Sequence, residues 1–379
     1  MRRASRLAMV ALVAACTPRA PSDPDAGPIA AVVTPDRDPG PRGIVVTASG
    51  EDLAIVGYAW APGATAAGDP PAFVDGWAVR FDHVLVTVAD VWLARDPDTD
   101  PANPLATGPI VARDAGPWAV DLSRGGPIAG KSGEPDEKTV ALTAFDGAAL
   151  DPTQRYAFGW SFATASAAAK PVNLDAEGAA LYERARQGGW AMVFTGTATY
   201  AGDAAAAGTP FAKMPRSVRF TLGLANPSRY SNCRNTDLMQ IGGEYPRGVQ
   251  PSATRATVAQ ITLHTDHLFW DALAVEGAPL HFDPFAAVAS TYGTGADEGQ
   301  TTNAELAALD VTGFQTRAGE ALPWRSLVSD WGAPNGQLHF EANGIPLRPR
   351  NGFLSFLEHA AASGGHMNAD GQCTITNAF

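Results

Sequence analysis

Two histidines and an aspartate lie close together in residues 261–271, which read ITLHTDHLFWD. His264 and His267 are three positions apart, with Asp266 between them. If the segment after residue 264 is helical, both imidazoles lie on one face and can reach one ion. Neutral imidazole is a common ligand of zinc and copper, and a nearby carboxylate can fix its tautomer. The spacing therefore indicates a transition-metal site for copper or zinc.

Another histidine and carboxylate follow in residues 280–283, which read LHFD. A tight turn at residues 277–278 would bring His281 and Asp283 alongside the first pair. We therefore expect both side chains to join the same metal site. Asp283 is also expected to cap a short helix that has proline at its first position.

Helix capping explains the first pair without a metal. Thr265 or Asp266 could accept hydrogen bonds from the N–H groups of the first helical turn, which would leave His267 on the surface. Acid–base catalysis by the histidines is a third interpretation. The HxxH spacing lacks the intervening glutamate of zinc peptidases, and the chain has no GxSxG nucleophile motif. Enzymatic activity is therefore not the favoured reading.

An acidic loop and two tryptophans are the other candidates for binding. Asp96, Asp98 and Asp100 are spaced like the start of a calcium loop, but the glycine and glutamate that such a loop needs are absent. Exposed aromatic rings can pack against sugars, and Trp324 and Trp331 lie in a sequence typical of loops. The alternative function is therefore a non-enzymatic cell-surface module that binds a protein or glycan partner.

The elements that must position these residues are mostly short strands. Apolar and polar residues alternate in segments punctuated by glycine and proline, which is typical of an antiparallel β-sandwich. A helix is expected over residues 174–189, capped by Asn173 or Asp175 and ended by Gly188 and Gly189. We predict a mainly β fold with short helical insertions and a helix-richer C-terminal part. The strands are expected at 76–94, 117–123, 138–145, 155–164, 190–202, 216–225 and 253–264, and the later helices at 265–273, 283–290, 303–310 and 351–363.

The N-terminal residues predict where the protein is located. A basic start, MRRASR, precedes the apolar run LAMVALVAA, and small residues stand before Cys16. This stretch resembles a bacterial lipoprotein signal peptide with its lipobox, VAAC. The resemblance implies a signal peptide at 1–15, lipid attachment at Cys16 and, because residue 17 is not aspartate, placement in the outer membrane, facing the periplasm or the cell surface. An ordinary secretory signal is the alternative.

Charge and cysteine content limit the partners and the organisation of the chain. The formal net charge is −12, which argues against nucleic acid as a partner. In an oxidising compartment Cys233 and Cys373 are expected to form a disulfide, because they lack the CxxC spacing of a thiolate metal site. We predict a proline-rich tether at 16–43, a β-sandwich domain at 44–265 and an α/β part at 266–379 that the disulfide ties to it.

The order of strands carries a further resemblance. The segments DGWAVRFDHVLVTVADVWLA, WAVDLS, YAFGWSF and RFTLGLA are similar in layout to periplasmic β-sandwich lipoproteins that bind copper in methanobactin-associated systems. The resemblance implies a β-sandwich core and copper binding, but it transfers no ligand to a residue of this chain. The sequence thus predicts a lipid-anchored extracytoplasmic protein that binds copper or zinc, with a metal-delivery or surface protein as its partner.

Overall fold

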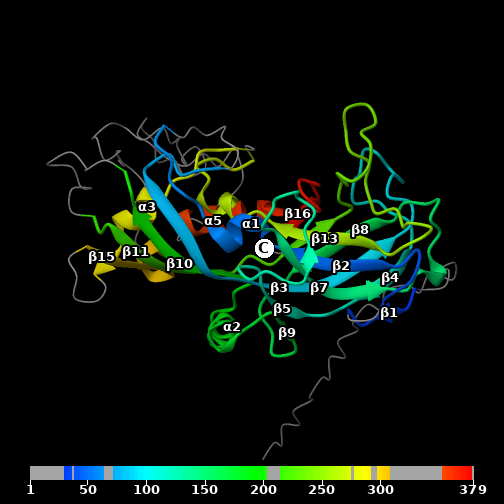
Figure 1. Cartoon of the computed structure of the whole chain (residues 1–379), viewed down its shortest axis with the longest axis horizontal. Helices are drawn as coiled ribbons and strands as arrows, with labels where there is room; N and C mark the ends of the chain where they lie inside the picture. Colours follow the sequence, from blue (N-terminus) through cyan, green and yellow to red (C-terminus); the bar gives the residue numbers. More distant parts are fainter. Residues whose placement is uncertain are drawn as a thin grey trace, which may run out of the picture.

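The computed structural model describes residues 30–35, 38–63, 71–202, 214–274, 277–291, 297–307 and 352–377. These residues form two β-sheets that share one cluster of buried apolar side chains (Figure 1). The prediction of a mainly β protein is confirmed. Cys16, Trp324 and Trp331 lie outside the described residues, so the lipid anchor and the glycan-binding tryptophans stay predictions.

The first sheet contains the strands that lead to the predicted metal site. Its order is β1-β7-β2-β13-β16, with β6 beside β7. The β2–β13 pair is parallel, so the prediction of purely antiparallel pairing is wrong. Parallel strands need a long crossover, and here the chain passes through the second sheet between β2 and β13. The strands are β1 (Val32–Val33), β2 (Ile44–Ser49), β6 (Ile128–Ala129), β7 (Lys138–Phe145), β13 (Thr257–Leu263) and β16 (Gly365–Met367).

The second sheet is larger and is built around the long strand β3. Its order is β14-β15-β11-β10-β3-β8-β12-β17, with β4 and β5 also on β3 and β9 on β5. The β11–β15 and β5–β9 pairs are parallel. The strands are β3 (Trp77–Ala94), β4 (Ile110–Asp114), β5 (Trp118–Asp121), β8 (Ala157–Phe162), β9 (Lys170–Val172), β10 (Met192–Tyr200), β11 (Ser217–Leu224), β12 (Ser228–Ser231), β14 (Ser290–Thr291), β15 (Glu298–Thr302) and β17 (Thr374–Asn377).

A bulge reverses the two faces of β3 partway along the strand. The strict alternation of its sequence predicts Trp77 and Leu85 on one face. The register with β10 shifts between Thr195 and Gly196. One extra residue moves every later side chain to the opposite face. Val84 therefore joins Trp77 in the main core, whereas Leu85 packs in a smaller cluster beneath helix α2.

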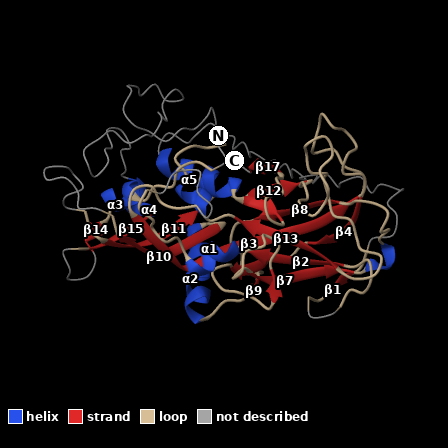
Figure 2. Ribbon diagram, turned by 45° about the horizontal axis from the view of Figure 1, so that its top comes forward, coloured by secondary structure: helices blue, strands red, loops and turns tan. Residues whose placement is uncertain are grey.

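The helices are short and pack against the strands. The capped helix α2 forms as predicted: the Asp175 carboxylate accepts a hydrogen bond from the N–H of Gly178, and Gly189 ends the helix in a left-handed conformation. Helices α3, α4 and α5 pack over β11 and β15 (Figure 2). Among the described residues no helix is long and apolar enough to span a membrane. The helices are α1 (Glu51–Val56), α2 (Ala176–Gly188), α3 (Asp283–Ala287), α4 (Asn303–Ala307) and α5 (Gly352–Ser363), with 3-10 turns η1 (Gly147–Ala149) and η3 (Asp266–Phe269).

The C-terminal segment contributes to both sheets. Strand β16 pairs with β13 in the first sheet and β17 pairs with β12 in the second. The expected disulfide joins Cys233, which follows β12, to Cys373, which lies directly before β17. The described residues after 264 contain both helices and strands, and the helix-rich character of the whole C-terminal part stays a prediction.

Candidate metal centre

The two histidines of the ITLHTDHLFWD segment lie where the first sheet ends. His264 follows β13 directly, and the helix expected over 265–273 is a single 3-10 turn, η3, that begins at Asp266. Strand β16 runs antiparallel to β13 and places His366 opposite Thr262. Alternate residues of a strand share a face, so His366 and His264 lie on the same face of the sheet. Strand pairing therefore adds a third histidine to the two predicted from sequence.

The three imidazoles converge with two carboxylates. The ring centroid of His264 lies 4.4 Å from that of His366 and 5.5 Å from that of His267. In the described residues, two groups have ligand atoms that all lie within 4.8 Å of one another: His264, Asp266 and His267, and His264, His366 and Asp370. We call these five residues the His264 cluster. The structure thus brings together His264, Asp266 and His267, as their spacing predicts.

Hydrogen bonds determine which ring nitrogens can bind an ion. Nε2 of His264 lies 3.1 Å from the carbonyl oxygen of Ala369 and donates to it, which leaves the Nδ1 lone pair available. Nδ1 of His267 lies 2.8 Å from Oγ of Ser363, and that hydroxyl donates its own hydrogen to the Ala360 carbonyl. The hydroxyl must therefore accept from His267, so Nε2 of His267 carries the lone pair.

Two of these nitrogens are buried without a partner. Nε2 of His267 and Nδ1 of His366 make no hydrogen bond, and the two residues are only 2% and 5% exposed. A buried polar atom that lacks a partner costs about 1–3 kcal/mol. Bonding to a cation would remove this cost, because each lone pair would then be used.

Burial keeps two of the imidazoles neutral. Burial, together with the charge of His264, lowers the pKa of His366 to about 3. Burial also lowers the pKa of His267 well below its usual value, and the neighbouring His264 and His366 lower it further. Burial alone would lower the pKa of His264, but the carboxylates of Glu51 and Asp266 outweigh this effect and raise it. His267 and His366 are thus uncharged at neutral pH, the form that binds metals.

Trp270 holds two residues of the cluster in place. Its indole Nε1 donates a hydrogen bond of 3.1 Å to Asp266, and its ring stacks on His267 with 3.5 Å between centroids. Burial raises the pKa of the Asp266 carboxyl, and the charge of His264 and the indole hydrogen bond oppose that rise. Thr265 makes no side-chain cap on η3, and its hydroxyl instead lies 2.8 Å from the Tyr58 hydroxyl. Thr265 therefore does not cap η3, whereas the Asp266 carboxylate accepts hydrogen bonds from the N–H groups of Asp266 and His267, which lower its pKa.

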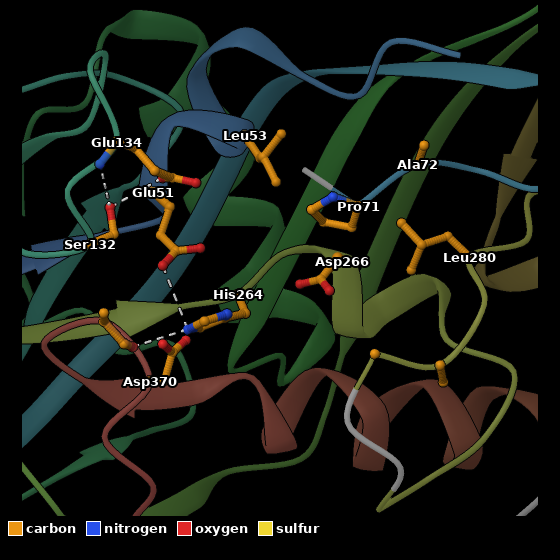
Figure 3. A pocket seen from close by; sticks show the side chains of 13 residues that line it. Glu51, Leu53, Pro71, Ala72, Ser132, Glu134, His264, Asp266, Leu280 and Asp370 are labelled. Carbon is orange, nitrogen blue, oxygen red and sulfur yellow. Dashed lines mark hydrogen bonds and ion pairs between the residues drawn. The ribbon is translucent and has the colours of Figure 1, made fainter. Parts of the chain in front are cut away.

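A pocket of about 360 Å³ opens beside the cluster. The His264 ring and the carboxylates of Asp266 and Asp370 reach its wall, as Figure 3 shows. Glu51 and Glu134 line the same wall. The pocket therefore places four carboxylates around the His264 ring, which belongs to both ligand groups.

Glu51 reaches this pocket through the parallel pairing that the sequence did not predict. Strand β2 places Ser49 opposite Thr262, and two residues later Glu51 meets His264, with 3.6 Å between Oε1 and Nε2. Its φ of 61° is uncommon for a residue other than glycine. Burial raises the pKa of its carboxyl to about 8, although His264 opposes that rise.

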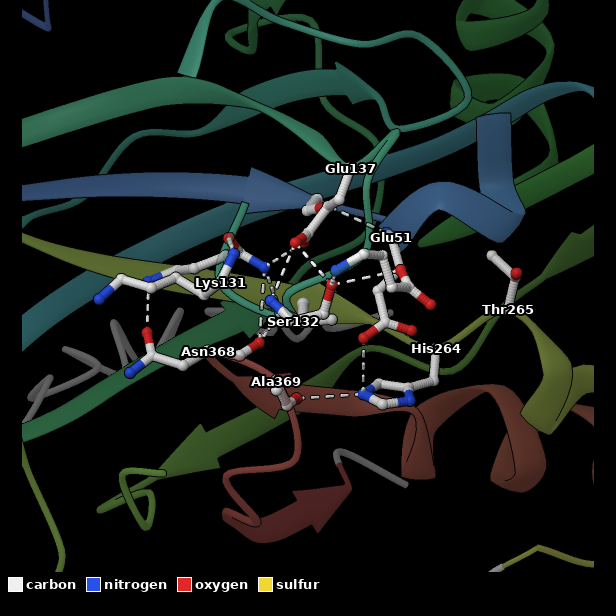
Figure 4. A network of polar contacts seen from close by, with 12 residues as sticks. Glu51, Lys131, Ser132, Glu137, His264, Thr265, Asn368 and Ala369 are labelled. Atoms are coloured by element: carbon white, nitrogen blue, oxygen red, sulfur yellow. Dashed lines mark hydrogen bonds and ion pairs between the residues drawn. The ribbon is translucent and has the colours of Figure 1, made fainter. Parts of the chain in front are cut away.

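A polar network around Ser132 and Glu137 fixes one wall of the pocket (Figure 4). The N–H of Asp52 donates 2.9 Å to Glu134, and the Ser132 hydroxyl lies 3.2 Å from Glu134 and 2.7 Å from Glu137. Gln260, on β13, donates 2.6 Å to Glu137. The acidic wall is thus tied to the same strand that carries His264.

His281 and Asp283 belong to a different group of buried side chains. The expected turn forms, with Gly277 in the left-handed region, and the N–H of His281 bonds to the Phe269 carbonyl. The His281 ring then lies between two carboxylates, 3.2 Å from Asp271 and 3.7 Å from Asp75. Burial would lower the pKa of His281, but hydrogen bonds to these carboxylates outweigh burial and raise it to about 9. Neither ligand group of the His264 cluster includes His281 or Asp283.

The expected capping role of Asp283 also differs in the structure. Asp283 is the first residue of α3, and the N-cap position is Phe282, which makes no side-chain cap. The Asp283 carboxylate instead accepts a 2.7 Å hydrogen bond from the indole of Trp77. We call His281, Asp75, Asp271, Asp283 and Trp77 the His281 group.

The comparisons with known proteins give no further guide to function. Neither protein-family models, nor curated proteins, nor solved structures yield a match to this chain.

The acidic loop that resembles the start of a calcium loop has a partner within the protein, because its Asp98 forms an ion pair with Arg155. A functional conclusion therefore depends on the geometry of the His264 cluster.

Proposed function

We propose that this protein binds one transition-metal ion, copper or zinc, at the His264 cluster. The observation that carries the proposal is the convergence of His264, Asp266 and His267, whose ligand atoms lie within 4.8 Å of one another. The hydrogen bonds leave one lone pair on the neutral form of each ring, and an ion that binds His264 displaces the proton that Glu51 and Asp266 favour.

The donor atoms favour a transition metal over calcium or magnesium. Imidazole nitrogen suits zinc and copper, whereas calcium and magnesium prefer sites made of oxygen ligands. His366 adds a third imidazole with a buried, unpartnered nitrogen. Each of the two groups thus combines two imidazoles with one carboxylate, a donor set of the kind that holds Zn²⁺ or Cu²⁺.

We further propose that the protein is an outer-membrane lipoprotein anchored through Cys16, with its two sheets packed as a sandwich. The lipobox-like sequence supports the anchor, and the Cys233–Cys373 disulfide agrees with an oxidising compartment. The similarity in strand order to copper-binding periplasmic lipoproteins would make copper the natural ion. A metal-delivery protein is then the expected partner.

Elemental analysis of the protein purified without chelators tests the proposal. Zinc or copper near one ion per chain is expected, and His264→Gln or His267→Gln should remove it. His281→Gln is the matched control, because it removes an equally buried histidine of the other group; once circular dichroism shows that this variant is folded, its metal content should be unchanged. Metal contents far below one per chain in the unmodified protein, under zinc and copper supplementation alike, would contradict the proposal.

A further inference from the structure

The His264 cluster contains two ligand sets that share one residue. Each set combines His264 with a carboxylate that lines the pocket and an imidazole that lies behind it. Asp266 and His267 complete the first set, and Asp370 and His366 complete the second. We call them the inner set and the outer set.

The inner set is the more firmly held of the two. Asp266 accepts the Trp270 indole N–H, and His267 is fixed by Ser363 and by stacking on Trp270. A ligand held in this way keeps its orientation and binds an ion more tightly. The inner set is therefore the better resting position for the ion.

The outer set is open to the solvent side. Asp370 is exposed and follows β16, and its carboxylate lines the mouth of the pocket beside His264 (Figure 3). His366, in the same set, is 5% exposed and has an Nδ1 atom without a hydrogen-bond partner. Asp370 is thus accessible to ions from solvent, whereas His366 is buried in the protein.

His264 cannot serve both sets fully at once. Its Nε2–H donates to the Ala369 carbonyl, so the neutral ring offers a single lone pair at Nδ1. An ion can therefore pass from Asp370 and His366 to Asp266 and His267 only by exchange at His264, the residue common to both sets. Such stepwise exchange never leaves a bare ion in the protein.

We propose that the outer set, His264, His366 and Asp370, is the exchange position through which a zinc or copper ion passes between the pocket and the inner set. This inference rests on the proposed function of the cluster. The outer set then governs how fast the ion enters and leaves, and the inner set governs how tightly it is held. A metal carrier would take up or deliver its ion at Asp370.

Stopped-flow kinetics with Zn²⁺ separates these two roles. Apoprotein mixed with Zn²⁺ gives the association rate, and zinc-loaded protein mixed with an excess of a fluorescent chelator gives the dissociation rate. Asp370→Asn should slow both rates by about tenfold, because a focusing carboxylate at the pocket mouth is lost. The Kd, their ratio, should change by less than about threefold because the resting ligands remain.

Two further variants make the result specific. Asp266→Asn should instead speed dissociation and weaken the Kd, since it alters the resting position. Asp100→Asn removes the same charge from an exposed loop residue that does not line this pocket, and it should change neither rate. Circular dichroism would verify that each variant is folded.

Two results would overturn the inference. If Asp370→Asn speeds dissociation as Asp266→Asn does, then Asp370 is an ordinary ligand of a single site. If it leaves both rates unchanged, the outer set has no part in exchange. Either result leaves the proposed function intact, whereas an unmodified protein that binds no Zn²⁺ or Cu²⁺ removes both.

Discussion

The two buried histidine groups of this protein use the same residue types for opposite purposes. Each contains a histidine, carboxylates and an indole that donates to one carboxylate, Trp270 to Asp266 and Trp77 to Asp283. In the His281 group the imidazole lies between two carboxylates and is itself the cation. In the His264 cluster, three imidazoles face one another and two of them are kept neutral by burial. The first group is complete in itself, whereas the second leaves buried nitrogens of His267 and His366 without a partner, which a metal ion would supply.

The difference shows what decides the role of a buried histidine. A carboxylate on each side of the ring raises its pKa and holds the proton. Neighbouring imidazoles lower the pKa and leave lone pairs available. The ratio of carboxylates to imidazoles around the ring therefore matters more than the presence of a histidine–carboxylate pair in the sequence.

The largest expected effect is the loss of stability when His281 is removed. His281→Leu leaves Asp75 and Asp271 buried without their cation, which should cost about 3–5 kcal/mol of unfolding free energy. Urea denaturation of the metal-free protein measures this cost. His267→Gln, measured in the same way, should cost much less, and equal costs for the two variants would erase the distinction between the groups.

Metal affinity should respond in the reverse pattern. His264→Gln removes the ligand common to both sets and should weaken Zn²⁺ binding by about 100-fold or more. Competition titration with a chelator of known affinity measures the change. His281→Gln should leave the affinity within about threefold of the unmodified protein. A comparable loss in both variants would place His281 in the metal site.

Stability should fall as the pH rises, because of His281. Its pKa is about 9 in the folded protein, above the usual 6.5, so its contribution is complete below pH 6.5 and is lost as the pH rises through 9. Between pH 7 and pH 9 the loss should be roughly 2 kcal/mol. Denaturation at several pH values measures it, and His281→Leu should reduce the slope to the part that Glu51 contributes, since the raised pKa of Glu51, about 8, also lowers stability as the pH rises. An unchanged slope in the variant would assign the pH effect to other residues.

The smallest effect concerns the two indole donors. Trp270→Phe keeps an aromatic ring against His267 but removes the hydrogen bond to Asp266, so Zn²⁺ affinity should fall by about tenfold. Trp77→Phe removes the matching hydrogen bond to Asp283 and should leave the affinity unchanged. Calorimetric titration of both variants provides the comparison. Equal affinities for the two would show that the Trp270 hydrogen bond does not position Asp266.

The sequence predicts local structure well and long-range pairing poorly. Strand β7 and helix α2 begin and end close to the predicted residues, because alternation, Asp175 and Gly189 are local signals. His264 and His267 could be identified because they are neighbours in the chain. The helix expected after residue 264 shortened to one turn, since Trp270 adopts an extended conformation that leads into the turn before His281.

The residues that the sequence did not identify are brought to the site by strand pairing. His366 and Asp370 arrive through the antiparallel β13–β16 pair, and Glu51 arrives through the parallel β2–β13 pair. Hydrophobic alternation gives the face of a strand but not its partner or direction. Because we expected only antiparallel pairs, the parallel β2–β13 pair and the contact between Glu51 and His264 that it creates could not be predicted.

Anomalous diffraction from crystals grown with Zn²⁺ tests the central claim most directly, because it locates the ion without reference to affinity. One anomalous peak within about 2.0–2.2 Å of a nitrogen of His264 is the expected result, with His267 or His366 as a second ligand. A peak between His281 and Asp271, or none near any histidine at saturating Zn²⁺, would contradict the account.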